Sequence, residues 1–152
     1  MSKKNAKGEA LVAFDGSASS IAALTWAAEN APLLNLEIEV VNVWEYVESA
    51  LDVAGVGFGS GGYVGESDPA LWSKQILKEG VAGVFGAEAE AIKTRSVEGG
   101  IVRTLVELSR EADLLIMGSR GHGKFADLIL GSISASCSAK SKCPVVIVHA
   151  PE

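Results

Sequence analysis

Short apolar runs alternate with longer, helix-periodic segments along this 152-residue chain. Short apolar runs predict buried strands near residues 10–14, 113–117 and 144–148, and residues 36–44, which alternate and then become apolar, predict another strand. A weaker alternation at about residues 90–97 is typical of an edge strand. Between the strands, apolar residues recur every three or four positions, which predicts four helices. The chain therefore contains strand–helix units repeated in series.

The predicted helices have recognisable starts. Ser17 or Ser19 is a candidate N-cap of the first helix, and Ser67-Asp68-Pro69 predicts the start of the second. The apolar positions of these two helices are Ile21, Leu24, Trp26, Ala27, Ala28 and Ala31, then Leu71, Ile76, Leu77, Val81 and Val84. Three glycines at positions 80, 83 and 86 weaken the second helix. The third helix follows Gly99-Gly100, and the fourth opens at Ser132.

This order of elements predicts a single Rossmann-like α/β domain over residues 9–150, with a mainly parallel open sheet and helices on both faces. Residues 1–8 are expected to be flexible, and the glycine-rich residues 51–66 are expected to form a mobile loop. Ligands of such sheets bind beyond the carboxyl ends of the strands, where the strand order reverses. Asp15 and Gly118 each follow a strand directly, so both lie at one crevice if the first and fourth strands are neighbours.

Composition narrows the class of protein. A net charge of −6 argues against broad binding to nucleic acid or to an anionic membrane. No apolar run approaches the roughly 20 residues of a membrane span, and no signal peptide is recognisable, so the expected location is the cytoplasm. Cys137 and Cys143 are expected to be reduced and packed in or near the core, since two histidines are too few for a zinc-type cluster.

Residues 118–132 hold the strongest chemical signal. Gly118 and Gly121 follow a buried strand, and Gly131 and Ser132 open the next helix. Glycine permits close approach of the backbone and positive φ, so that N–H groups converge on an anion. Ser132 adds a hydroxyl and the N–H groups of a first helical turn. The segment predicts a seat for a di- or triphosphate, whereas the competing interpretation is simple turn geometry.

Two other nucleotide-binding motifs match the sequence only in part, and two single residues allow two interpretations each. Residues 118–125 nearly match the ATPase phosphate loop, but Phe125 replaces the hydroxyl residue that would hold Mg²⁺. Glycines at 57, 59 and 62 match a dinucleotide pattern without its strand and helix. Arg120 and Lys124 either neutralise phosphate charge or are ordinary solvated residues. Asp15 either caps the first helix or contacts a ribose hydroxyl.

The chain resembles the universal stress protein family over about residues 9–150. The resemblance lies in VAFDGSASS near the N-terminus, in DLLIMGSRG, LILGSISAS and CPVVIV near the C-terminus, and in the spacing G-x2-G-x9-G-[ST] that marks the ATP-binding branch. The chain departs from the family at Glu98-Gly99-Gly100, where a Gly-x-Pro turn is common. The resemblance implies five parallel strands in the order 3-2-1-4-5, with ATP, with or without Mg²⁺, between the first and fourth strands.

Carried over by position, the resemblance implies a set of nucleotide contacts. Asp15 meets the ribose, the Val43 backbone meets adenine, and Ala13 lines the base pocket. Met117 and Gly118 flank ribose and phosphate, and Arg120 lies beside them. The triphosphate is surrounded by Gly121, Gly131, Ser132, Ile133 and Ser134. The resemblance also implies a homodimer, paired through strand 144–148, whose apolar edge would otherwise be exposed.

Three functions stay open at this point. The first is an ATP-dependent sensor or regulator in a stress response, which binds ATP or a related adenine nucleotide. The second is a slow ATPase or a nucleotide-transferring enzyme on the same fold, although no general base is evident and Asp127 is the acidic residue nearest the glycines. The third is a scaffold in which the glycine loop is purely structural.

Overall fold

The computed structural model describes residues 6–46, 68–121 and 130–151. The predicted loop 51–66 and the first five residues of the predicted flexible N-terminus lie outside this part of the chain. Five strands form one parallel sheet in the order β3-β2-β1-β4-β5, which confirms the predicted topology. The strands are β1 Gly8–Ala13, β2 Leu36–Trp44, β3 Lys93–Glu98, β4 Leu114–Gly118 and β5 Val145–Val148.

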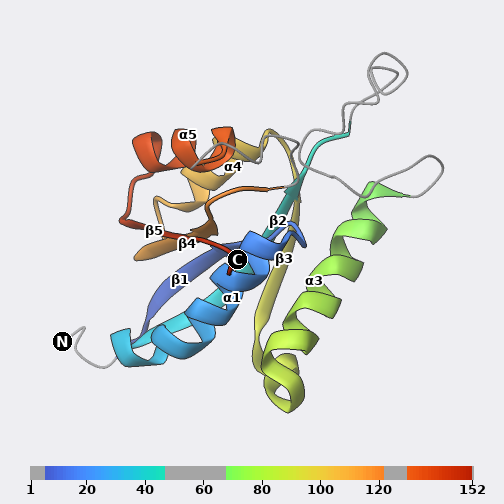
Figure 1. Ribbon diagram of the computed structural model, residues 1–152, viewed down its shortest axis with the longest axis vertical. Coiled ribbons are helices and arrows are strands. Elements are labelled where there is room, and N and C mark those ends of the chain that lie inside the picture. Colours follow the sequence, from blue (N-terminus) through green and yellow to red (C-terminus); the bar gives the residue numbers. More distant parts are fainter. Residues whose placement is uncertain (1–5, 47–67, 122–129, 152) are drawn as a thin grey trace.

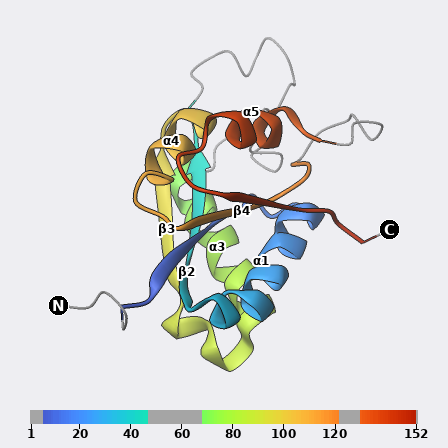
Figure 2. The ribbon, with the colours of Figure 1, turned by 90° about the vertical axis from the view of Figure 1, so that its left-hand side faces the viewer.

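Four α-helices cover the two faces of this sheet: α1 Ala18–Asn30, α3 Pro69–Phe85, α4 Ile101–Leu108 and α5 Ser132–Lys140. Figures 1 and 2 show α1 and α3 on one face and α4 and α5 on the other. Short 3₁₀ segments, Pro32–Leu34 and Gly86–Ala91, follow α1 and α3. Within the described residues, no helix combines the length and the apolar composition that a membrane span requires.

Capping fixes the starts of the first two helices. Ser17 is the N-cap of α1, because its Oγ accepts the Ser20 N–H at 3.2 Å; Ser19 is already inside the helix. Asp68 caps α3 by accepting the Ala70 N–H at 2.9 Å. Such caps stabilise a helix by about 0.5–2 kcal/mol each. Gly86 ends α3 with a φ of +57°, a conformation that favours glycine.

The sheet separates two hydrophobic cores. Alternate strand residues pack on α1 and α3 or on α4 and α5, as the period of two requires. Leu24 and Ile116 are fully buried in the first core, and Leu115 is fully buried and Leu11 almost so in the second. Burial of each such side chain contributes about 1.5–3 kcal/mol. These cores fix the strand ends that form the pocket described below.

Two details of the sequence-based expectation are wrong. The edge strand β3 begins at Lys93 instead of about residue 90, because Gly86–Ala91 forms a 3₁₀ turn that ends with Ile92 N–H donating to Ala89 O. Ile21 and Leu71, assigned to the buried helix faces, are 44% and 65% exposed. Both lie in the first turns of their helices, and Ile21 is exposed although the neighbouring Ser19 and Ser20 are buried.

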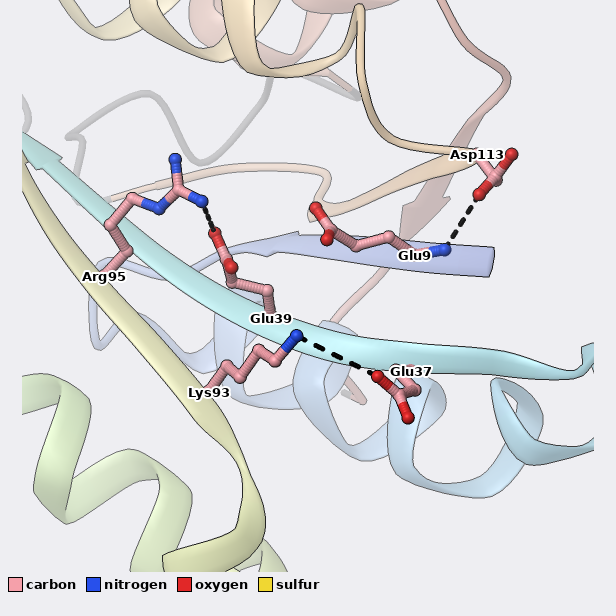
Figure 3. A network of polar contacts seen from close by, with 6 residues as sticks. All are labelled: Glu9, Glu37, Glu39, Lys93, Arg95 and Asp113. Carbon is pink, nitrogen blue, oxygen red and sulfur yellow. Dashed lines mark hydrogen bonds and ion pairs between the residues drawn. The ribbon is translucent and has the colours of Figure 1, made fainter. Parts of the chain in front are cut away.

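Charged side chains occupy the N-terminal half of the sheet on the α4/α5 face (Figure 3). Arg95 Nη2 lies 2.7 Å from Glu39 Oε1, and Lys93 Nζ lies 3.9 Å from Glu37 Oε2. Lys93 is directly opposite Glu39 in the ladder, so the two ion pairs run diagonally between β2 and β3. This half of the face is polar, and the apolar half lies toward the carboxyl ends of the strands.

Candidate functional site

A pocket opens at the carboxyl ends of β1, β2 and β4, next to the first turns of α1, α4 and α5. Its empty space is about 520 Å³, counting the space that is open to solvent. The strand order reverses between β1 and β4, where β2 lies on one side and β5 on the other. The pocket therefore lies at the switch point expected for a parallel open sheet.

Most of the residues singled out in the sequence come together here. Nine of them line the pocket: Ala13, Asp15, Val43, Met117, Gly118, Arg120, Gly121, Ile133 and Ser134. Gly131 and Ser132 are not among its lining residues. Gly131 lies just behind, with its N–H donating to Ser119 O at 2.6 Å, and the exposed Ser132 is the first residue of α5. Lys124 and Asp127 lie outside the described residues.

Sequence reasoning missed a further set of lining residues: Phe14, Ser17, Ser20, Val41, Asn42, Ile101 and Leu105. Ile101 and Leu105 lie four positions apart on the apolar face of α4, a pattern that equally indicates ordinary core. Asn42 is the more informative omission, because an amide inside the apolar run of β2 needs a buried partner. Its Nδ2 donates to Phe14 O at 2.8 Å and joins the ends of β1 and β2.

The turn between β1 and α1 is built around Asp15. Its Oδ1 accepts the Ser17 N–H at 2.9 Å, and its own N–H donates to Ser20 Oγ at 3.3 Å. Gly16 adopts a φ of +83°, which a side chain would disfavour. The alternative that Asp15 caps α1 is wrong, because Ser17 does so. Asp15 instead fastens the turn and presents a carboxylate at the pocket wall.

The glycines of the 118–131 segment serve close packing. The expectation of positive φ is wrong, since Gly118, Gly121 and Gly131 are not among the described residues with positive φ. A Cβ on Gly118 would lie 2.6 Å from the carbonyl carbon of Ser19, and one on Gly131 would lie 3.3 Å from Ser119 O. Glycine is required because protein segments approach each other here, whatever binds in the pocket.

The start of α5 offers donors to the pocket. Its N-cap is Gly131, which makes no side-chain capping bond. The N–H groups of a first helical turn have no acceptor within the helix and carry the positive end of its dipole. Ser134 lies 4% exposed in this turn, and its Oγ donates to Gly118 O at 2.7 Å. The side chain of Ser134 thus holds α5 against the end of β4.

Neither a metal centre nor a cysteine site appears in the described part of the chain. No group of three or more His, Cys, Asp or Glu side chains there is arranged to hold a metal ion. Both cysteines are free, as expected. Burial raises the pKa of the Cys137 thiol to about 11, so this side chain is a protonated core residue at neutral pH.

The comparison with protein families gives one match over nearly the whole chain. The model of the universal stress protein family matches residues 9–149. Over 163 residues the chain is 31% identical to a universal stress protein of Mycobacterium tuberculosis, covering 100% of this chain and 51% of that protein. A universal stress protein of Mycolicibacterium smegmatis is 30% identical, with 91% and 47% covered. The chain spans about half the length of these curated relatives.

Solved structures agree on the fold. A universal stress protein in complex with cAMP is 28% identical, with a TM-score of 0.62 over 97% of this chain and 100% of that chain. UspA from Lactobacillus plantarum has a TM-score of 0.69 at 21% identity, with 95% and 99% covered. An Archaeoglobus fulgidus universal stress protein in complex with dAMP has a TM-score of 0.59 at 19% identity, with 93% and 97% covered. The last two show likeness of fold alone.

Proposed function

Because the chain belongs to the universal stress protein family, we propose that it is a stress-response sensor or regulator that binds an adenine nucleotide, ATP first among them. The nucleotide occupies the pocket at the ends of β1, β2 and β4. Its binding changes the conformation of the protein or its affinity for partners. The free cysteines favour a reducing compartment such as the cytoplasm.

The observation that carries this proposal is the chemical division of the pocket. Toward β2 and α4 its wall is apolar at Val41, Val43, Ile101 and Leu105, and the Asn42 amide is the polar group on this side. Toward the turns after β1 and β4 it is polar, with Asp15, Ser17 and Arg120. A nucleotide is divided in the same way, with a flat base at one end and an anionic tail at the other.

The polar side of the pocket has one part suited to a ribose and another suited to phosphate groups. A carboxylate repels phosphate, so Asp15 suits the hydroxyl donors of a ribose. The Arg120 guanidinium and the uncapped first turn of α5 attract anions, so the phosphates lie on that side. Any Mg²⁺ is held mainly by the phosphates themselves. The cAMP complex of a 28% identical relative supports an adenine nucleotide as the class of ligand.

The test is to identify what the purified protein carries. The protein is denatured, and the supernatant is analysed by ion-pair chromatography, before and after incubation with ATP and Mg²⁺. Stoichiometric ATP supports the sensor, and ADP formed from added ATP supports a slow ATPase. An empty protein that shows no heat with ATP, ADP, AMP or cAMP in isothermal titration calorimetry contradicts the proposal and leaves the scaffold.

We also propose that the protein forms a homodimer through β5. This strand is an edge of the sheet and pairs only with β4 within the described chain. Its four residues, Val145–Val148, are apolar and only partly buried. Antiparallel pairing with the same strand of a second copy covers this edge. Size-exclusion chromatography with light scattering measures the mass at micromolar concentration.

A further inference from the structure

Helix α3 packs against the ring of Phe14, a residue that also lines the pocket. Phe14 directly follows β1, is 4% exposed, and lines the pocket. It also belongs to the hydrophobic core that includes Leu77 and Val81 of α3. One residue therefore contacts both the ligand space and a helix on the outer layer of the fold.

Gly80 of α3 makes room for the Phe14 ring. A Cβ on Gly80 would lie 2.6 Å from Cε1 of this ring, and closer still to Cζ. Side-chain carbons do not approach other atoms so closely, so the ring fills the space that a side chain at position 80 would need. Gly83, three residues further along the same helix, has no atom within 4 Å of its Cβ position. Packing thus requires glycine at position 80, but not at 83.

The main chain of Phe14 is held from the other side by β2. Its N–H donates to Val41 O at 2.8 Å, and its carbonyl accepts from Asn42 Nδ2 at 2.8 Å. Asp15, the next residue, carries the carboxylate at the pocket wall. Because the main chain is fixed and the core is closely packed, displacement of the ring by a side chain at position 80 strains the end of β1, which leads into Asp15.

We propose that Gly80 is a positioning residue of the nucleotide site. By letting the Phe14 ring rest against the backbone of α3, it keeps the end of β1 and Asp15 in the arrangement that forms the pocket. The position of α3 and the shape of the pocket are thereby coupled, although Gly80 itself is not among the lining residues. The nucleotide in this proposal is that of the proposed function, whereas the contact between Gly80 and the Phe14 ring does not depend on any ligand.

The test is a cycle of variants in the full chain. Gly80→Ala, with Gly83→Ala as the matched control, is made both in the wild type and in Phe14→Leu, which lacks the clashing ring atoms. ATP affinity is measured by calorimetry. We expect Gly80→Ala to weaken ATP binding about tenfold in the presence of Phe14, and by less than about twofold in the Phe14→Leu background. Gly83→Ala leaves affinity within about twofold in both backgrounds. Thermal unfolding checks that each variant is folded.

Several results would overturn the inference. Wild-type affinity in Gly80→Ala contradicts it, as does an equal loss in both backgrounds or an equal loss in Gly83→Ala. A ligand-free readout separates it from the proposed function: in NMR spectra of the unliganded protein, Gly80→Ala must shift the amide signals of Asp15 and Gly121, and Gly83→Ala must not. If the wild type binds no nucleotide, the proposed function fails, and these signals still decide whether α3 positions the pocket.

Discussion

Gly121 lies directly against the carboxylate of Asp15, since a Cβ on Gly121 would lie 2.7 Å from Asp15 Oδ2. The contact joins the turn after β1 to the turn after β4, and both residues line the pocket. Residues 106 positions apart in sequence are thereby adjacent in the fold. This adjacency explains why an aspartate after the first strand and a glycine after the fourth serve one site.

Gly121→Ala is expected to impair ligand binding more than folding. The new methyl group displaces the Asp15 carboxylate, but Gly121 itself is exposed and has no core neighbour among the described residues. We expect ATP affinity to fall about tenfold, with the free energy of unfolding unchanged within about 0.5 kcal/mol. Calorimetry and urea unfolding measure the two quantities. Unaltered affinity would remove Asp15 from the set of ribose contacts.

Gly118→Ala is expected to impair folding first. Its Cβ would lie 2.5 Å from Ser19 Cβ and 2.6 Å from the Ser19 carbonyl carbon, inside the packing of β4 against α1. Backbone atoms cannot rotate aside, so we expect a loss of about 1–3 kcal/mol in the free energy of unfolding. Gly83→Ala is the control and gains up to about 1 kcal/mol from helix propensity. Equal stability of the two variants would contradict the packing argument.

Glu9→Gln is expected to stabilise the protein at neutral pH. Burial raises the pKa of Glu9 from its usual value of 4.5; the carboxylates of Glu39 and Glu111 raise it further, and Lys93 and Arg95 oppose them. A raised folded-state pKa means that the protonated form is favoured by folding. The contribution of protonated Glu9 to the free energy of unfolding is present below pH 4.5 and is lost as pH rises through the folded-state pKa.

The stability gained by Glu9→Gln should therefore appear at pH values above the folded-state pKa of Glu9 and vanish below pH 4.5. Urea unfolding at pH 4 and at pH 7 measures the difference. Glu29→Gln, on the exposed surface of α1, is the control for the loss of one negative charge. A gain of the same size at both pH values would show that the effect of Glu9→Gln is not the removal of its ionised form.

Ile147→Pro is expected to prevent dimer formation and to preserve the monomer. The carbonyls of Pro144 and Val148 accept hydrogen bonds from β4, so the alternate residues Val145 and Ile147 direct their N–H groups to the free edge. Proline at 147 removes a donor from that edge without removing a β4–β5 hydrogen bond. Light scattering should report a monomer, whereas Ile147→Leu should stay dimeric. A dimeric proline variant would exclude this edge as the interface.

The fold is largely predictable because its signals are local. The apolar run 36–44 coincides with β2, and Ser17 and Asp68 cap their helices through residues two or three positions away. The start of β3 was harder to predict, because a 3₁₀ turn over residues 86–91 has no apolar period of its own. Local patterning thus identifies elements better than it places their ends.

The site is less predictable because its constraints connect distant residues. The motif glycines are visible in sequence, but the reason for Gly118 is its contact with Ser19, almost a hundred positions away. The Phe14–Gly80 contact has no sequence signal at all, since a glycine within a helix merely looks unfavourable. Ile101 and Leu105 have a core-like spacing, and only their position beside the carboxyl ends of the strands makes them part of the pocket wall. These properties follow from tertiary packing.

The two ends of the sheet differ in how they resist opening. Helix α4 has eight residues and spans about 12 Å, whereas the nine residues of β2 span about 30 Å. The side chains of Glu37 and Lys93 at the charged end are more than half exposed, so we expect amide protons to exchange faster there than in the buried strand ends. The pocket lies at the opposite end, where β1 and β4 are buried. We therefore expect a ligand to bind strands that are already ordered.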